Sequence, residues 1–505
     1  MENSLIKNAK ILRLLEDYRV IWALGHFSGL GYWDLETYIP QDGVEARGEA
    51  LSKIESLSQK LFLDKDFVKQ IKECAKIEDL NDYEKGIVRL LERKLKFYES
   101  LPAAFLEEFV RTASESTNIW RKAKDTNNFS LFEPYLQKIV ELSRQKAKYL
   151  GYKEHPYDAL LDDYEEGLTT KEVEEYFNSL KGLIVNLLNK IKSSKKYCLT
   201  SPITEETYDP EKMSKFTKEL LSVLHGKLSD LRVDVSSHPF SINLGYGDSR
   251  ITTRYLGKDF ARSYGSTIHE FGHALYELQS HKDLSYAPTK GGTSLIIHES
   301  QSRFWENFIG RSKEFLETVH KMLVEAQPTL KKYSLDDIYH YLNLVRPSLI
   351  RTESDEVTYH LHILIRFEIE KGLIEGSIEV KDLPRVWANL YKKYLDVDVT
   401  SDKEGVLQDV HWGQGSIGYF PTYSFGTALS AMWMDKLESE LGDISLLLKS
   451  SEGTLKIKNW LRENIHQYGS TYTFKDLVKK VTGESFNTKH LLDYLTNKYN
   501  KVYPI

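Results

Sequence analysis

The 505-residue chain has few cysteines, no long apolar run and no excess of basic residues. Its only cysteines, Cys74 and Cys198, exclude a disulfide framework and a cluster of thiolate metal ligands, so we expect a reducing compartment and predict a cytoplasmic protein. The formal net charge of -6 argues against a nucleic-acid partner, because such binding requires a basic surface that displaces counterions. Because no stretch reaches about 18 uninterrupted apolar residues, we expect no membrane span.

Helical spacing dominates the sequence. Apolar residues recur every three or four positions from residue 1 to about 230, as in Leu136, Ile139 and Leu142. The stretch Met1 to Asp17 shows this spacing with charges of both signs, and it lacks the continuous apolar region and the cleavage site of a secretory signal. We therefore expect an amphipathic helix at the start of the mature protein.

A short region of different texture interrupts the helices. Between Val235 and Leu256, β-branched and aromatic residues alternate around Gly245 and Gly247, which predicts one or two short strands. Elsewhere Gly, Pro, Asn and Asp cluster only at short breaks, none long enough for a flexible linker. The sequence therefore predicts a single domain over residues 1–505, mostly α-helical, with a small sheet directly before the most informative motif.

That motif is His269-Glu270-Phe-Gly-His273. Two imidazoles four residues apart lie on one face of a helix and can reach one metal ion. Glu270 lies about 100° around the helix from His269 and can reach a water molecule on that ion. The pattern predicts a hydrolytic zinc site, and hence a zinc peptidase.

A plain amphipathic helix is the alternative, in which Ile268 and Phe271 face a core and both histidines are solvated. A second predicted helix, capped by Ser294, argues against it because it supplies an acidic group, Glu299, 26 residues after His273. Catalytic zinc uses three protein ligands, and two histidines with one glutamate are a standard set. We predict Glu299 as the third ligand.

Two neighbours of Glu299 have secondary interpretations. His298 points about 100° away from it and is expected to pack beside the site or orient a ligand rather than bind the ion. Glu306 lies two turns further on the same face, where it either accepts a proton from the far nitrogen of a ligating histidine or is solvated. In the expected mechanism, zinc activates a water and polarises the scissile carbonyl, while Glu270 takes the water proton and returns it to the leaving amine.

Further motifs resemble one peptidase family. In chain order they are His238-Pro239-Phe240, Asp248-Ser-Arg250-Ile-Thr252, His269 to His273, His298-Glu299-Ser300-Gln301 and Gly405-Val-Leu-Gln408-Asp409-Val-His411-Trp412. Together they resemble the M32 metallocarboxypeptidases, the thermostable carboxypeptidase family of bacteria, archaea and some protists. The IRxxAD motif of that family reads Ile350-Arg351-Thr-Glu-Ser354-Asp355 here, with serine in place of alanine.

The resemblance carries several expectations. It implies a mostly helical zincin-type metallopeptidase with a deep groove between two lobes, related to the neurolysin-like oligopeptidases. It implies release of single C-terminal amino acids from peptides with broad side-chain tolerance. It also implies one Zn²⁺ ion per subunit, with Co²⁺ as an alternative, and a homodimer.

A carboxypeptidase must hold the free carboxylate of its substrate, and a guanidinium group matches that shape. By resemblance Arg351 is the candidate, whereas a helix-start ion pair with its acidic neighbours is the alternative. Gln408 is a second candidate donor to the same carboxylate. Arg250 lies in the strand before the metal helix, where an edge strand would pair with an extended substrate or, alternatively, only support the sheet.

The glycine-rich loop from Gly413 to Tyr423 lacks the Lys-Ser/Thr ending of a phosphate-binding loop, which argues against nucleotide binding. His411, with Tyr423 or Tyr419, is a candidate donor to the oxyanion of the tetrahedral intermediate. Of the two tyrosines, Tyr423 is preferred because it directly precedes the helical pattern from Ser424 to Leu437.

Two other functions fit part of the pattern. An endo-acting oligopeptidase of the neurolysin type would match Glu299, Ser302 and Glu306 equally well, but it would not need the HPF, IRxxAD and GxxQDxHW motifs together. A binding protein that has lost its chemistry would not need Glu270, which is intact. The sequence therefore favours a metallocarboxypeptidase.

Overall fold

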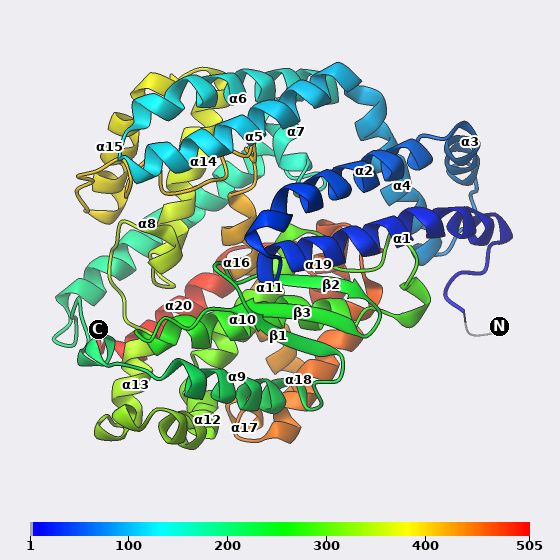
Figure 1. Ribbon diagram of the computed structural model, residues 1–505. Coiled ribbons are helices and arrows are strands. Elements are labelled where there is room, and N and C mark those ends of the chain that lie inside the picture. Colours follow the sequence, from blue (N-terminus) through cyan, green and yellow to red (C-terminus); the bar gives the residue numbers. More distant parts are fainter. Residues whose placement is uncertain (1–3) are drawn as a thin grey trace. The chain divides into compact units, whose positions relative to one another are not determined.

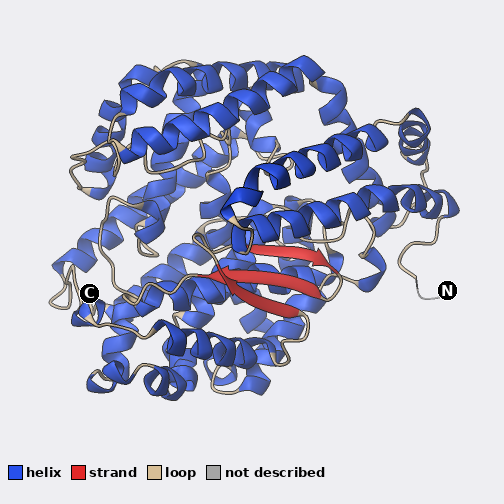
Figure 2. Cartoon of the chain, viewed as in Figure 1, coloured by secondary structure: helices blue, strands red, loops and turns tan. Residues whose placement is uncertain are grey.

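The structure, a computed structural model, describes residues 4–505. The chain is predominantly helical (Figure 1), and its strands form a three-stranded sheet in the described part (Figure 2). This confirms a large helical protein with a small sheet beside the HExxH helix, while the groove between two lobes stays a prediction. In the described residues, no helix has both the length and the apolar character needed to cross a membrane.

The predicted N-terminal helix starts later than expected. Helix α1 (Ala9–Thr37) begins after Asn8, whose side chain accepts hydrogen bonds from the backbone N–H groups of Lys10 and Ile11. Such an N-cap satisfies donors that would otherwise be unpaired at the start of the helix. Residues 1–3 of the predicted helix lie outside the described residues.

The chain divides into two compact units, each assembled from three separate segments. The first unit contains Met1–Lys96, Ser201–Leu342 and Ser430–Phe486, and the second contains Phe97–Thr200, Asn343–Leu429 and Asn487–Ile505. The prediction of a single domain over residues 1–505 stays a prediction.

The first unit contains the sheet and most of the helices. Besides α1 and the elements described below, its helices are α2 (Val44–Phe62), α3 (Lys65–Cys74), α9 (Pro210–His225), α12 (Lys313–Ala326), α13 (Leu335–Leu342), α17 (Ile444–Leu447), α18 (Ser451–Asn464) and α19 (Phe474–Thr482). The second unit contains α5 (Ala103–Asp125), α6 (Phe129–Leu150), α7 (Pro156–Asp162), α8 (Thr170–Ser193), α14 (Tyr359–Glu375), α15 (Leu383–Leu395) and α20 (Lys489–Val502). Along the chain, α4 (Asp82–Ser100) and α16 (Pro421–Leu441) span positions at which one unit gives way to the other.

The sheet has one more strand than the sequence predicted. It consists of β1 (Leu231–Val235), β2 (Ser241–Gly245) and β3 (Asp248–Thr253), in the order β1-β3-β2. Strand β1 runs parallel to β3, and β2 runs antiparallel to it. The alternation of Leu231-Arg-Val-Asp-Val was missed because it falls between the helical pattern, which ended at about residue 230, and the predicted strand region, which began at Val235.

Helix α10 (Phe260–Leu278) carries the HExxH motif and packs against β2 and β3 (Figure 1). The side chains of Ile268, Phe271 and Leu275 on this helix are fully buried. Burying such an apolar face is the main stabilising contribution to an amphipathic helix, at about 1.5–3 kcal/mol per large side chain. The core packing thereby fixes the direction in which the polar face of α10 points.

Helix α11 (Leu295–Arg303) crosses α10 at very short range. Ser294 caps α11 as predicted, with its side chain accepting from the backbone N–H of Ile297. A Cβ atom on Gly272 would lie 2.5 Å from the carbonyl oxygen of Gln301, so only glycine allows the two backbones to approach this closely. Helix α10 thus meets α11 directly beside His273.

Candidate metal centre

The two histidines of the motif lie side by side on α10. Their ring centroids are 5.0 Å apart, and the side chains of His269 and His273 are only 18% and 19% exposed. The alternative of an amphipathic helix with solvated histidines is therefore wrong. Burial lowers the pKa of His273 well below its ordinary value, whereas the carboxylates of Glu299 and Glu306 outweigh burial and raise that of His269.

Glu299 on α11 completes a set of three donor atoms. Its Oε2 atom lies 3.7 Å from the Nε2 atom of His269 and 3.7 Å from the Nε2 atom of His273. Tetrahedral zinc with ligands at its usual distances places donor atoms about 3.3 to 3.6 Å apart. The donor set and its spacing therefore fit a single ion bound by His269, His273 and Glu299.

The other hydrogen bonds of the Glu299 carboxylate leave its Oε2 atom directed at His269 and His273. Arg303 donates to Oε1 of Glu299 at 2.7 Å, and the Ser302 hydroxyl donates to Oε2 at 3.1 Å. Both donors lie on the same helix as Glu299. Because the arginine occupies Oε1, Oε2 is the oxygen that faces the two imidazoles.

Glu306 contacts His269, which is the first of the two alternatives that the sequence left open, and the solvated alternative is wrong because Glu306 is buried. Its Oε2 atom lies 2.9 Å from the Nδ1 atom of His269, while Arg303 and Arg311 also donate to its carboxylate. Burial raises the pKa of Glu306, but the two arginines more than offset this and keep its carboxyl group ionised. The single α-helix expected here is wrong, because α11 gives way to a π-helical segment, η4 (Phe304–Gly310), which carries Glu306. Such segments are rare and occur frequently at functional sites.

His298 contacts the second histidine of the motif and is not one of the three converging ligands. Its Nδ1 atom lies 3.2 Å from the Nδ1 atom of His273, on the side of that ring away from Glu299. The expectation that His298 orients a ligand is consistent with this contact.

Glu270 lies on α10 next to His269, with only 7% of its surface exposed. Burial raises the pKa of this carboxyl group to about 7, and the negative charges of Glu299 and Glu306 contribute in the same direction. Its carboxyl group is therefore buried within the electrostatic influence of His269 and Glu299, two of the three converging ligands.

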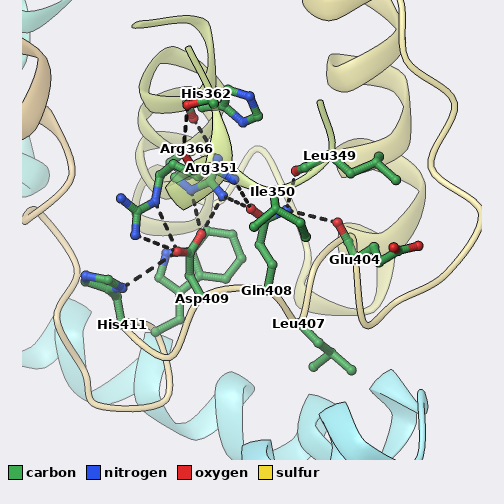
Figure 3. A network of polar contacts seen from close by, with 12 residues as sticks. Leu349, Ile350, Arg351, His362, Arg366, Glu404, Leu407, Gln408, Asp409 and His411 are labelled. Carbon is green, nitrogen blue, oxygen red and sulfur yellow. Dashed lines mark hydrogen bonds and ion pairs between the residues drawn. The ribbon is translucent and has the colours of Figure 1, made fainter. Parts of the chain in front are cut away.

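In the second unit, Asp409 links two arginines (Figure 3). Arg351 donates to Oδ1 of Asp409 from Nε at 3.1 Å and from Nη2 at 2.9 Å, and Nε of Arg366 donates to Oδ2 at 2.7 Å. Arg366 is fully buried and Arg351 is 7% exposed. The predicted alternative, in which Arg351 pairs with the acidic residues next to it in sequence, is wrong because Asp409 is its ion-pair partner.

Gln408 is committed to contacts within the protein (Figure 3). Its Oε1 atom accepts from the backbone N–H of Arg351 at 3.0 Å and from Nη2 of Arg366 at 2.7 Å. Its Nε2 atom donates to the carbonyl groups of Leu349 and Glu404. The predicted hydrogen bond to a substrate carboxylate would require one of these bonds to break, so Gln408 instead orders the segment that holds both arginines.

His411 and the two tyrosines form an aromatic cluster beside these charges. The hydroxyl of Tyr423 lies 3.4 Å from Nε2 of His411, and the Tyr419 ring lies 5.4 Å from the His411 ring and 5.1 Å from that of Tyr423. Burial lowers the pKa of His411 to about 4, so its ring is neutral near pH 7. Tyr423 lies inside α16, which starts at Pro421 rather than at the predicted Ser424.

Glu370 on α14 anchors the loop that carries His411. Its carboxyl oxygens accept from the indole N–H of Trp412 at 2.8 Å, from the backbone N–H of Gly418 at 2.9 Å and from the hydroxyl of Tyr157. Burial raises the pKa of Glu370 to about 7.

Arg250 is held by its own strand in the first unit. It forms a two-pronged ion pair with Asp248, with Nε–Oδ1 and Nη2–Oδ2 distances of 2.9 Å. The predicted edge position is wrong, because β3 is the central strand and pairs on both sides with β1 and β2. Its backbone is therefore not available to an extended peptide, and a substrate contact by Arg250 would have to come from its side chain.

Sequence reasoning missed several charges that are buried or largely shielded, including Arg366 and Glu277. The Oε1 atom of Glu277 lies 2.9 Å from the Nε2 atom of His298. Arg366 is the sole charge in the run from Leu361 to Phe367, and a lone arginine in such a run signals a buried ion pair. Glu277 follows His273 by one helical turn, and that spacing on the metal-binding face was its signal.

Comparison with known proteins agrees with this chemistry. Residues 13–499 match the family model described as carboxypeptidase Taq (M32) metallopeptidase. Thermostable carboxypeptidase 1 of Pyrococcus furiosus is 44% identical over 497 residues, which cover 98% of this chain and 99% of that protein. Carboxypeptidase 1 of Bacillus subtilis is 38% identical over 496 residues, which cover 97% of this chain and 98% of that protein.

Solved structures are similarly close. A structure of the Pyrococcus furiosus carboxypeptidase aligns with a TM-score of 0.96 at 44% identity, covering 98% of this chain and 100% of that one. The M32 carboxypeptidase of Deinococcus radiodurans aligns with a TM-score of 0.95 at 30% identity, covering 99% of this chain and 100% of that one.

Proposed function

The chain belongs to the carboxypeptidase Taq (M32) metallopeptidase family and is a metallocarboxypeptidase that hydrolyses peptides, and from this premise we propose that it is zinc-dependent and removes single C-terminal residues. We propose broad tolerance of the released side chain. The observation that carries the proposal is the convergence of His269, His273 and Glu299 beside the buried carboxyl group of Glu270.

His269, His273 and Glu299 hold the ion, with Zn²⁺ the proposed metal and Co²⁺ an alternative, because both favour this ligand set. When bound, the ion supplies a Lewis acid that activates water and polarises the scissile carbonyl. Glu306 contacts Nδ1 of His269, and His298 contacts Nδ1 of His273, so both rings are oriented through the nitrogen that does not face the ion.

Glu270 is the proposed general base and then general acid. It accepts the proton of the attacking water and delivers it to the nitrogen of the leaving amino acid. His411 in its neutral form, with Tyr423 or Tyr419, is proposed to donate a hydrogen bond to the oxyanion.

Arg351 is the proposed anchor for the terminal carboxylate of the peptide. The support is a local excess of positive charge, since Arg351 and Arg366 share the single carboxylate of Asp409. The nearby carboxyl of Glu370 is not a full countercharge at neutral pH, because burial raises its pKa to about 7. An anionic ligand at Arg351 would balance the remaining charge.

We further propose a cytoplasmic location and a homodimer, with no nucleic-acid or membrane partner. The location is supported by the two cysteines, which are both free thiols in the structure. The homodimer is carried over from the family resemblance alone.

Glu299→Ala is expected to lose the metal, because only two of the three protein ligands remain. Elemental analysis of dialysed protein measures this directly, with wild-type protein treated in parallel. Retention of one zinc ion per chain by Glu299→Ala would show that another carboxylate is the third ligand.

The exopeptidase activity is tested with an N-blocked dipeptide and its C-terminally amidated counterpart. Losing the charged partner of Arg351 is expected to lower kcat/KM for the amide about 30- to 5000-fold, because the amide cannot form the buried charge-assisted pair. Release of the C-terminal product is quantified for both. Equal turnover of acid and amide, with internal cleavage of longer blocked peptides, would instead support an endo-acting oligopeptidase.

A further inference from the structure

A chain of three side chains leads away from the metal centre through His273. The Nδ1 atom of His273 lies 3.2 Å from Nδ1 of His298, and Nε2 of His298 lies 2.9 Å from Oε1 of Glu277. His273 and Glu277 are one turn apart on α10, whereas His298 comes from α11. All three are shielded, with Glu277 16% exposed and His298 22% exposed.

The protons in this chain can be assigned from donor and acceptor chemistry. An ionised carboxylate only accepts hydrogen bonds, so Nε2 of His298 must carry the proton that bonds to Glu277. A neutral imidazole has one N–H, which makes Nδ1 of His298 an acceptor. The proton between the two rings therefore lies on Nδ1 of His273. The lone pair on Nε2 of His273 is then left facing Glu299.

Glu277 is held in the ionised form that this assignment needs. Lys290 Nζ lies 3.3 Å from one carboxylate oxygen, and the backbone N–H of Gly292 donates to the other at 3.0 Å. Although burial raises it, the bond from His298 and the charge of Lys290 lower the pKa of Glu277 to about 2. Glu277 is thus a fixed acceptor at neutral pH.

We propose that Glu277 is a positioning residue for the metal centre, which acts through His298 to hold His273 in the tautomer that leaves Nε2 free to bind the ion. This inference rests on the proposed metal site. The two ligating histidines are then oriented in different ways. The carboxylate of Glu306 contacts His269 directly, whereas the carboxylate of Glu277 acts on His273 only through the imidazole of His298.

The chain leaves the His298 ring little freedom. A Cβ atom on Gly292 would lie 2.3 Å from atoms of that ring and 2.8 Å from the ring of Tyr276. The Tyr276 ring itself lies 5.1 Å from the His298 ring. Gly292, Tyr276 and Glu277 therefore all restrict the orientation of the His298 ring. A histidine that only filled space would not need its orientation to be fixed in this way.

Zinc affinity, measured by competition with a chromogenic chelator, tests the proposal. Glu277→Gln is expected to weaken zinc binding about 10- to 100-fold, because an amide can present either a donor or an acceptor to His298 and no longer selects one tautomer. Gly292→Ala leaves Glu277 in place but displaces the His298 ring, and it is expected to weaken zinc binding similarly. Thermal unfolding of the metal-free proteins shows whether each variant is folded.

A double variant separates action through His298 from a general structural role. In a His298→Phe background the relay is already broken, so adding Glu277→Gln is expected to cause no further loss of zinc affinity. Wild-type affinity in Glu277→Gln, or single losses that multiply in the double variant, would overturn the proposal.

The wild-type protein provides two further readouts. Long-range ¹H–¹⁵N spectra of the zinc-loaded protein are expected to show His298 protonated at Nε2 and His273 at Nδ1, and the opposite tautomers would contradict the assignment. Failure of wild-type protein to bind one zinc ion per chain would overturn the proposed metal centre itself, whereas tight wild-type binding that Glu277→Gln leaves unchanged would overturn only the role of Glu277.

Discussion

Replacing Glu270 by glutamine is expected to lower kcat by about 10²- to 10⁴-fold, the range for loss of a general acid–base group. Glutamine has nearly the same size as glutamate but cannot take a proton from water. Glu270 does not contribute any of the three donor atoms that converge at the metal centre. The metal content of the variant should therefore remain that of the wild type. Steady-state kinetics on an N-blocked dipeptide, with elemental analysis of the same preparation, measures both quantities.

The comparison with Glu299→Ala makes this result specific. Both changes remove a buried carboxylate from the same centre, but only the second removes a donor atom. Glu270→Gln should therefore have strongly reduced turnover with its metal content intact, whereas Glu299→Ala should lose turnover together with the metal. Near-normal turnover of fully metal-loaded Glu270→Gln would remove Glu270 from the mechanism.

Arg351→Ala is expected to lower kcat/KM for free-acid peptides by about 30- to 5000-fold, because losing one buried charge-assisted pair costs about 2–5 kcal/mol. Amidated peptides lack the group that Arg351 is proposed to bind, so their already low turnover should fall little further. Asp409 keeps a partner in this variant, since Arg366 also donates to its carboxylate. Loss of fold is therefore not the expected cause of the defect.

The test of Arg351→Ala depends on how much kcat/KM falls for free-acid peptides relative to amidated peptides. Zinc content and the midpoint of thermal unfolding should be measured on the same protein, to show that the metal centre and the fold are intact. Equal impairment of acid and amide with both controls unchanged would make Arg351 a structural residue. The anchor for the carboxylate would then have to be another cation, for which Arg250 is the remaining candidate.

The sequence predicted those parts of the centre that depend on local geometry. Helical periodicity alone puts His269 and His273 on one face, and Glu299 follows from an acidic residue on a second capped helix. The helical class and the sheet next to α10 also follow from residue spacing.

The parts that were missed depend on contacts between distant residues. The ion pair between Arg351 and Asp409 joins positions 58 residues apart, and no local pattern specifies such a partner. The π-helical segment that carries Glu306 departs from the regular period that any helical pattern assumes. The central position of β3 required knowledge of β1, whose register with β3 cannot be inferred from either strand alone.

The close crossing at Gly272 has a consequence for protein design. The HExxH motif is written with two unrestricted positions, which here are Phe271 and Gly272. The second position cannot accept even a methyl group in this chain, because the backbone of Gln301 on the neighbouring helix occupies that space. Grafting His269, Glu270 and His273 onto an isolated helix would transfer two donors and a base without the third donor. A transplanted centre therefore needs both helices as one unit, with the glycine that lets them touch.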